Sequence, residues 1–500
     1  MKTIRTLTLL TLACLATAQS AVAASDPTQL SASEAVALLK AGKISSEQLT
    51  QAYLDKAKAN GDLNAFITLD EKGALAAART RDAEHGKGRG KGALNGLPIV
   101  VKDNIQVAGL PNTAGTPGLK DFVAKADAPV VARLKKAGAI VLGTTNMHEL
   151  AFGISGYNEG FHGSQIGVRN AYDRTRFAGG SSSGTGAAIG ARLAPAGLGS
   201  DTGGSARIPA AVNGIAGFRP SVLRYSQDGI APISHTRDTA GILAQTVADV
   251  ALLDAVITGG KPVKPANIKG ARLGVMRSYF FQNLDADTTA VMEKALAKLK
   301  EAGAEIVEVD MPGLADLNNA QSFPIALYEA YDDLQAYLKR YGTGHTVEGI
   351  AMKIASKDVK GTYDGLVIPR KLPGPNNTLV DAKPIYEAAM KEHRPKLQKL
   401  YADTFKKHRL DALVFPTTPK VAIAQNAEAS SLANFGLFIQ NTDPGSNAGI
   451  PGLSIPAGLG ASGQPVGLEI DGPAKSDRRL LVLGMAIEKT LGRLPAPTVK

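Results

Sequence analysis

Cysteine and tryptophan are nearly missing from this 500-residue chain, which has one cysteine and no tryptophan. The single thiol, Cys14, lies in the first 23 residues, which we expect to be removed from the mature protein. A mature chain without a thiol has no disulfide, no zinc–thiolate site and no cysteine nucleophile. Mechanisms that depend on a thiolate are therefore excluded.

Motifs for metals and nucleotides are missing as well. The seven histidines show no spacing typical of metal ligands, so we predict no metal site. No Gly-Lys-Ser or Gly-Lys-Thr ends a phosphate-binding loop, and the glycines from Gly184 to Gly190 miss the dinucleotide-binding spacing by one residue. The sequence therefore predicts no cofactor. We expect His148 and His235 to be hydrogen-bonded structural residues and not bases.

The chain also lacks a dense basic tract. Its formal net charge of +11 falls to +9 when Lys2 and Arg5 leave with residues 1–23, which carry no acidic residue. The remaining excess is spread over helix-like stretches such as 294–300 and 391–407. Solvated helix faces explain this pattern better than nucleic-acid binding does, so we expect no nucleic-acid partner.

The first 23 residues have the three parts of a secretory signal peptide. A basic start is followed by the apolar run Leu7 to Ala18 and by small residues that end at Ala23, after which we expect cleavage. An N-terminal core helix is a weaker interpretation, because the segment has no polar face. A lipid anchor on Cys14 would need an aliphatic residue where Thr11 stands. We expect a periplasmic or secreted protein without stable membrane association.

Strand-like and helix-like segments alternate along residues 24–500, which we interpret as one domain because no linker divides them. The expected helices are near 31–41, 45–59, 129–137, 187–193, 238–259, 288–302 and 480–491, and the expected strands near 65–68, 96–102, 140–142, 196–199, 272–276, 305–309, 410–415, 453–455 and 466–470. This alternation predicts an α/β fold, with a mixed and mostly parallel central sheet covered by helices on both faces. Residues 315–408 look helical, without clear strands, and could form a cap.

Lys102 ends a short apolar strand-like run that begins at Pro98. Its period-two neighbours, Val100 and Pro98, are apolar. One interpretation is that Lys102 marks the point where the strand meets solvent, and the pattern alone favours it. The other is a desolvated lysine whose lowered pKa lets the neutral amine act as a base.

Two glycine-rich and serine-rich stretches, 179–184 and 199–205, bracket a predicted helix and strand. This order places Ser181 at the start of the helix and Ser205 just after the strand. Both then lie, with Lys102, at the carboxyl edge of the sheet, where open α/β folds place their sites. The backbone N–H groups around Thr202, Gly203 and Gly204 could converge on an oxyanion, or these glycines could form a plain tight turn.

The segment Gly180-x-Ser182-x-Gly184 also matches the nucleophile elbow of α/β-hydrolases. The preceding residues, 174–179, are polar, and no strand leads into the turn. We therefore set this interpretation aside.

Several motifs together resemble the amidase signature family. They are Val101-Lys102-Asp-Asn104, Gly143-Thr-Thr-Asn146-Met-His-Glu149, Gly179-Gly-Ser-Ser-Ser-Gly184, Gly203-Gly-Ser205-Ala-Arg207-Ile-Pro209, Gly217-Phe-Arg-Pro220 and Pro451-Gly-Leu-Ser-Ile-Pro456. The resemblance covers nearly all of residues 24–500. Ala206 departs from it, because the family usually has a larger aliphatic residue at this position.

The resemblance implies an amidase-signature fold and a catalytic relay of Lys102, Ser181 and Ser205. Ser181 would follow a cis peptide bond and carry a proton from Ser205 to the neutral amine of Lys102. The N–H groups of residues 202 to 205 would hold the oxyanion, and no cofactor would be needed. The implied enzyme is a serine amidase that forms an acyl-enzyme.

The segments 146–153, 233–238 and 441–451 most resemble the branch of indoleacetamide and mandelamide hydrolases, so we expect small arylalkyl primary amides as substrates. Export instead resembles the peptide amidases, and an ester or carbamate could react at the same site. Two interpretations are disfavoured: a tRNA-dependent amidotransferase subunit, because of the signal peptide, and a non-catalytic binding protein, because Lys102, Ser181 and Ser205 are all present. The sequence leaves open whether the protein forms a homodimer.

Overall fold

The computed structural model describes residues 26–88, 92–163 and 166–498 of the chain. The predicted signal peptide, residues 1–23, lies outside the described residues. None of the described helices is both long enough and apolar enough to cross a membrane.

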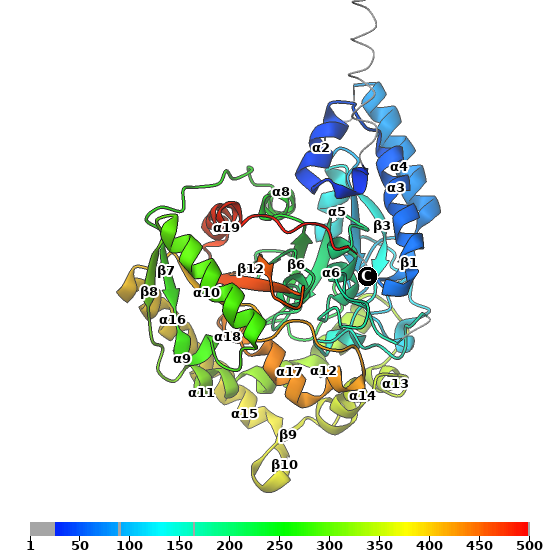
Figure 1. Ribbon diagram of the computed structural model, residues 1–500. Helices are drawn as coiled ribbons and strands as arrows, with labels where there is room; N and C mark the ends of the chain where they lie inside the picture. Colours follow the sequence, from blue (N-terminus) through cyan, green and yellow to red (C-terminus); the bar gives the residue numbers. More distant parts are fainter. Residues whose placement is uncertain (1–25, 89–91, 164–165, 499–500) are drawn as a thin grey trace, which may run out of the picture.

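One large sheet of eleven strands organises the described residues (Figure 1). In spatial order the strands are β1 (Phe66–Leu69), β3 (Ile140–Thr145), β2 (Pro98–Lys102), β4 (Ala196–Asp201), β6 (Thr239–Ala244), β5 (Ala216–Arg219), β12 (Gly452–Leu459), β13 (Pro465–Asp471), β11 (Ala412–Pro416), β7 (Arg272–Val275) and β8 (Glu305–Glu308). The predicted α/β class and the mixed sheet are confirmed.

Parallel pairing is less common in this sheet than the sequence suggested. Only β3–β2, β2–β4, β11–β7 and β7–β8 pair in parallel, and the pairs from β4 through β11 are antiparallel. The expectation of a mostly parallel sheet was therefore wrong. One reason is the short connection over residues 460–464 between β12 and β13, which suffices for a hairpin but not for a parallel crossover.

Helices cover both faces of the sheet, as predicted. The helices outside residues 314–408 are α2 (Ala32–Lys40), α3 (Ser46–Ala59), α4 (Glu71–Gly86), α5 (Pro129–Lys136), α6 (Ser183–Gly190), α7 (Arg207–Val212), α8 (Val247–Thr258), α9 (Arg277–Phe280), α10 (Ala286–Glu301), α17 (Leu432–Ile439), α18 (Asp443–Ala448) and α19 (Asp477–Leu491). On β12, Leu453 faces Gly484 of α19, whereas the neighbouring Gly452 faces Arg207 of α7. Because successive strand residues point to opposite faces, α19 and α7 lie on opposite sides.

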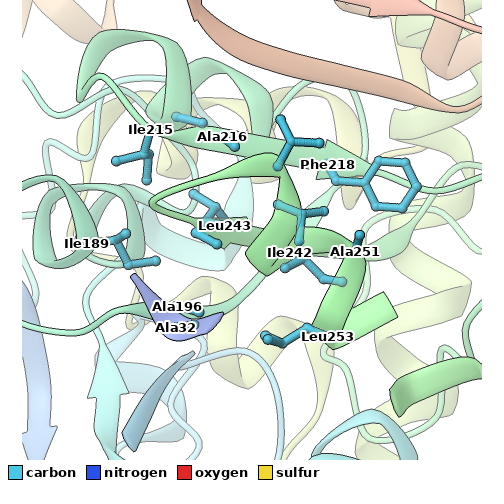
Figure 2. Close-up of a cluster of buried hydrophobic side chains, with 14 of the residues drawn as sticks. Ala32, Ile189, Ala196, Ile215, Ala216, Phe218, Ile242, Leu243, Ala251 and Leu253 are labelled. Atoms are coloured by element: carbon cyan, nitrogen blue, oxygen red, sulfur yellow. The ribbon is translucent and has the colours of Figure 1, made fainter. Parts of the chain in front are cut away.

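The centre of the sheet is buried among aliphatic side chains. Figure 2 shows one part of this core, in which Ile189 of α6 and Leu253 of α8 lie around the side chains of β5 and β6. Both residues have no exposed surface. Interiors of this kind are close-packed, so the strand ends that carry the candidate site have a rigid support.

The predicted long helix over residues 238–259 is wrong. Residues Thr239–Ala244 form β6, which lies between β4 and β5, and only Val247–Thr258 form helix α8. Every residue of β6 is buried, because both faces of this central strand are covered. A continuous apolar run does not distinguish a buried strand from a buried helix. Here pairing with β4 and β5 makes these residues a strand.

Residues 314–408 are mainly helical, and most of them lie toward the bottom of Figure 1, whereas the last helix of this range lies at the left near β8. They form α11 (Leu314–Asn319), α12 (Ser322–Arg340), α13 (Val347–Ala351), α14 (Lys357–Thr362), α15 (Ala382–Ala388) and α16 (Arg394–His408), with π-helical turns at 363–367 and 389–393. A small hairpin of β9 (Lys371–Pro373) and β10 (Leu379–Asp381) interrupts them, which the sequence did not predict. This region packs against the rest of the protein through apolar side chains: Leu327, Leu334 and Ile350 form one buried cluster with Leu119 and Phe122.

Candidate active site

The three predicted catalytic residues lie at one edge of the sheet. Lys102 is the last residue of β2, and Ser205 follows β4, which ends at Asp201. Ser181 stands two residues before α6, which begins at Ser183. Because β2 and β4 are parallel neighbours, their carboxyl ends meet at this edge, as the sequence suggested.

Lys102 is fully buried, so it does not mark the point where the strand meets solvent. Its Nζ lies 2.7 Å from Oγ of Ser181 and 2.8 Å from Oγ of Ser200. Burial lowers the pKa of Lys102 to about 7, because desolvation penalises the ammonium form. The negative charges of Asp201 and Asp238 oppose this shift and raise the pKa in part.

Ser181 follows a cis peptide bond with Gly180, as the resemblance implied. The adjacent Ser182 connects the two serine-bearing loops: its N–H donates to the carbonyl oxygen of Ser205 at 3.1 Å. Its hydroxyl also donates to the carbonyl oxygen of Ser200 at 3.1 Å. The geometry thus joins Lys102 to Ser181, but no hydrogen bond connects the hydroxyls of Ser181 and Ser205 within the described residues.

The turn that carries Ser205 presents backbone N–H groups, although not all of those expected. The N–H of Gly204 donates to Oδ1 of Asp201 at 2.9 Å, so it is already engaged. Among the described residues, the N–H groups of Thr202, Gly203 and Ser205 donate to no protein acceptor. The structure therefore differs from the expectation at Gly204, and the three remaining N–H groups are the available donors.

A buried charge network lies behind the nucleophile turn. Asp201 accepts hydrogen bonds from Nε of Arg207 at 3.1 Å and from Nη1 of Arg219 at 2.9 Å. Arg207 also pairs with Glu469 at 2.5 Å, and all four side chains are fully buried. Burial alone would raise the pKa of Asp201. The two guanidinium groups together outweigh this effect and hold the pKa well below its usual range. Asp201 therefore remains an anion that orders the turn.

Ala206, the departure from the family pattern, is explained by its neighbour. It is fully buried, and a Cβ added to Gly241 of β6 would lie 2.5 Å from the Cβ of Ala206. The turn thus packs closely on the backbone of β6. A small side chain fits this contact.

A cavity of about 410 Å³ opens onto Ser205. Its lining is predominantly apolar and comes from three parts of the chain: the strand-end loops, residues 314–408 and α17. The apolar lining residues are Ala151, Phe152, Ile154, Ile233, Phe323, Ala326, Leu327, Leu366, Leu432, Phe435 and Ile439. Thr202 and Gly203 lie on the same wall as Ser205. An apolar cavity of this size with a few polar groups is typical of a small-molecule site.

Two polar residues next to Lys102 were not predicted. Ser200 contacts Nζ of Lys102, and Nδ2 of Asn104 donates to the hydroxyl of Ser200 at 3.1 Å. Ser200 lies one residue before the end of β4, next to Asp201. This position near the strand end was the signal that could have placed Ser200 in the site. Asn104 was visible in the lysine motif, but without an assigned role.

The two histidines are hydrogen-bonded, as predicted. His148 is buried and contacts Asp358, whereas the side chain of His235 is 59% exposed and contacts Asp333. Atoms of His235, Glu329 and Asp333 lie within 4.8 Å of one another, a spacing that could admit a cation. Glu329 already accepts hydrogen bonds from Ser234, Thr236 and Tyr386.

The chain belongs to the Amidase family, whose model matches residues 48–481. It is 47% identical over 472 residues to mandelamide hydrolase of Pseudomonas putida, covering 94% of this chain and 93% of that protein. It is 39% identical over 460 residues to indoleacetamide hydrolase of Agrobacterium vitis, covering 90% and 95% of the two chains.

Solved structures confirm the fold. A peptide amidase in complex with the inhibitor chymostatin superposes with a TM-score of 0.81 at 31% identity, covering 94% of this chain and 99% of that one. A crystal structure of an amidase gives a TM-score of 0.80 at 31% identity, with 93% and 100% covered. The protein is thus an amide-hydrolysing enzyme with an amidase-signature fold.

Proposed function

We propose that this enzyme hydrolyses small arylalkyl primary amides, such as mandelamide or indoleacetamide, to the carboxylic acid and ammonia. The carrying observation is the apolar cavity that opens onto Ser205, because the aryl group of such an amide gains stability by leaving water. Phe152, Phe323 and Phe435 line this cavity and offer aromatic contacts. The names of the two curated relatives support the same substrate class.

The proposed chemistry uses Ser205 as nucleophile. Neutral Lys102 takes a proton through Ser181, and the resulting alkoxide of Ser205 attacks the amide carbon. The free N–H groups at Thr202, Gly203 and Ser205 hold the oxyanion. The proton on Lys102 then returns through Ser181 to the leaving nitrogen, and water hydrolyses the acyl-enzyme. A hydroxyl contact between Ser181 and Ser205 must form when substrate binds.

The state of Lys102 supports this order of events. An ammonium ion has no lone pair and cannot accept a proton, so a lysine with an ordinary pKa would be inactive near neutral pH. The burial of Lys102 makes the neutral amine available at that pH. In the neutral form Nζ accepts the hydroxyl proton of Ser181 at 2.7 Å and donates an N–H to Oγ of Ser200 at 2.8 Å.

The competing substrates are peptide C-terminal amides, and esters or carbamates that react at the same serine. The likeness to the peptide amidase structure favours the first of these. A panel of phenylacetamide, mandelamide, indoleacetamide, a dipeptide amide and phenylacetic acid methyl ester, assayed with purified protein, decides between them. We expect the highest kcat/KM for an arylalkyl amide. A higher kcat/KM for the dipeptide amide would contradict the proposed substrate class.

We also propose that the enzyme is exported and acts in the periplasm or outside the cell. The basic start, the apolar run and the small residues up to Ala23 support this location. N-terminal sequencing of the protein recovered from a periplasmic extract should begin at Ala24. Recovery of the intact chain in the cytoplasm would contradict export.

A further inference from the structure

One wall of the cavity carries a chain of hydrogen bonds that the proposed chemistry does not use. Nε2 of His148 lies 2.9 Å from Oδ2 of Asp358, and Nδ1 of the same ring lies 3.3 Å from Oγ of Ser155. Oγ of Ser155 in turn lies 2.7 Å from Oγ of Ser430. Asp358 and Ser430, the two ends of this chain, both line the cavity that opens onto Ser205.

The residues of the chain come from segments far apart in the sequence. Asp358 belongs to α14 in the helical region, and Ser430 ends the short 3₁₀ helix Ala427–Ser430. His148 and Ser155 come from the loop after β3 and are fully buried. The buried pair therefore connects two cavity-lining groups that share no hydrogen bond with each other among the described residues.

The direction of the hydrogen bonds follows from what each group can donate. A carboxylate only accepts, so Nε2 of His148 carries a proton and donates it to Asp358, and in this tautomer Nδ1 carries none. Nδ1 then has a lone pair and accepts the hydroxyl proton of Ser155. Because that proton is used, Ser430 must donate its own proton to Ser155. Asp358 and Ser430 are then left with lone pairs only.

The cavity-facing oxygens thus form an acceptor surface without a donor. Oδ1 of Asp358 bonds to no other side chain among the described residues, and the Asp358 side chain is 26% exposed. Two other lining residues are cationic: Nη2 of Arg237 pairs with Asp443 while its Nε has no partner among the described residues, and Lys357 is exposed to solvent. An apolar cavity with an acceptor surface on one wall favours a ligand that carries a hydrogen-bond donor, such as an N–H, on an otherwise apolar group.

We propose that Asp358 and Ser430 recognise an N–H donor on the acyl group of the substrate, so that the preferred amides carry a ring N–H or an acylamino N–H in addition to the aryl surface. This inference rests on the proposed function, since it takes the cavity as the acyl site of the amidase. It makes Asp358 a specificity-determining residue, held in place by His148.

Matched substrates that differ by one hydrogen test the proposal. Indole-3-acetamide and 1-methylindole-3-acetamide share the ring and the scissile amide, but the second has no ring N–H. The acylamino source is tested with N-acetylphenylalaninamide against 3-phenylpropanamide. The wild-type enzyme should favour the N–H member of at least one pair by about tenfold to a hundredfold in kcat/KM, the range for one hydrogen bond to a charged group.

Variants separate the hydrogen bond from a steric effect of the added methyl group. In Asp358→Ala the preference should fall to near one, and in Ser430→Ala it should fall in part. Ser322→Ala removes another hydroxyl from the same cavity and should keep the preference. A preference that persists unchanged in both Asp358→Ala and Ser430→Ala would overturn the proposal, because the methyl group would then act by its size.

A binding measurement separates this proposal from the proposed reaction. In Ser205→Ala, titration calorimetry should show tighter binding of the N–H member by the same factor, whether or not the wild type turns the amide over. Equal affinities within both pairs would overturn the N–H recognition. Hydrolysis of both members at equal rates would also overturn it, while leaving the arylalkyl amidase assignment intact.

Discussion

Nζ of Lys102 lies 2.7 Å from Oγ of Ser181, and neither side chain has any surface exposed to solvent. Water cannot solvate an ammonium ion at this position, and the negative charges of Asp201 and Asp238 compensate only in part. This contact therefore gives the enzyme a lysine that can accept a proton near neutral pH. The catalytic proposal depends on that property.

The first prediction concerns pH. Because the pKa of Lys102 is lowered to about 7, the neutral form should increase as pH rises through 7. We expect kcat/KM for phenylacetamide to rise between pH 5 and pH 8, with an apparent pKa near 7, and to fall toward zero at lower pH. Lys102→Ala should lower the rate by a factor of about 10²–10⁴, the usual contribution of a general base. A profile that stays flat down to pH 5 would rule out this role.

The second prediction concerns Ser200, which accepts a hydrogen bond from Lys102 at 2.8 Å and one from Asn104 at 3.1 Å. Removing its hydroxyl in Ser200→Ala takes away a group that stabilises the charged amine and fixes its position. We expect kcat to fall with little change in KM, and the apparent pKa of the pH profile to move below that of the wild type. An unchanged pKa together with a lower melting temperature would instead indicate a purely structural role.

The third prediction concerns the anion behind the nucleophile turn. Asp201→Asn would leave Arg207 and Arg219 buried with less than their full counter-charge, so the free energy of unfolding should fall by about 3–5 kcal/mol. Asp62, which pairs with Arg174 and is 55% exposed, is the matched control. Asp62→Asn should cost no more than about 1 kcal/mol. Urea denaturation followed by circular dichroism measures both, and equal losses would contradict the prediction.

The fourth prediction concerns Gly203. A Cβ at this position would lie 2.7 Å from Cδ1 of Ile439, so Gly203→Ala should push Ile439 into the cavity or displace the turn. A displacement of about 1 Å at a reacting centre can cost roughly a hundredfold in rate, so kcat/KM should fall steeply. Gly436→Ala, on α17 with open space around it, is the control and should keep full activity. Comparable kcat/KM values for the two variants would show that the close packing of Gly203 is unimportant.

The fifth prediction concerns the aromatic wall. The ring centroids of Phe323 and Phe435 lie 5.7 Å apart, and both rings line the cavity. Phe435→Ala should raise the KM for phenylacetamide about tenfold and change little for acetamide, which has no ring to bury. Leu379→Ala, which removes an exposed apolar side chain on β10, should leave both values unchanged. Equal effects of Phe435→Ala on the two amides would exclude a role in binding the ring.

Local signals predicted local structure well. The spacings Ser31-x-x-Glu34 and Ser45-x-x-Gln48 are those of capping boxes, and both boxes are formed at the starts of α2 and α3. The alternation of helices and strands also placed Lys102, Ser181 and Ser205 at one sheet edge, because that inference needs only the order of elements. Residues Thr239–Ala244 were misassigned because their burial in the middle of the sheet is a property of the whole fold.

Contacts between segments that are far apart in the chain could not be predicted from the sequence. Nothing local links His148 to Asp358, which is 210 residues away, or Arg207 to Glu469, which is 262 residues away. The hydrogen bond between Gly204 and Asp201 depends on the path of the turn, which glycine leaves open because it tolerates positive φ. The order of elements therefore predicted where the site lies, but which of its hydrogen-bonding groups are free depends on the path of the folded chain.

Ammonia release by the wild type and by Ser205→Ala tests the central claim most directly. Phenylacetamide, mandelamide and indoleacetamide are each incubated with the two proteins, and a serine-directed phosphonate is used in parallel, with the labelled peptide located by mass spectrometry. We expect ammonia release and labelling at Ser205 in the wild type, and the loss of both in a folded Ser205→Ala. Hydrolysis that persists in Ser205→Ala, or labelling at another serine, would contradict it.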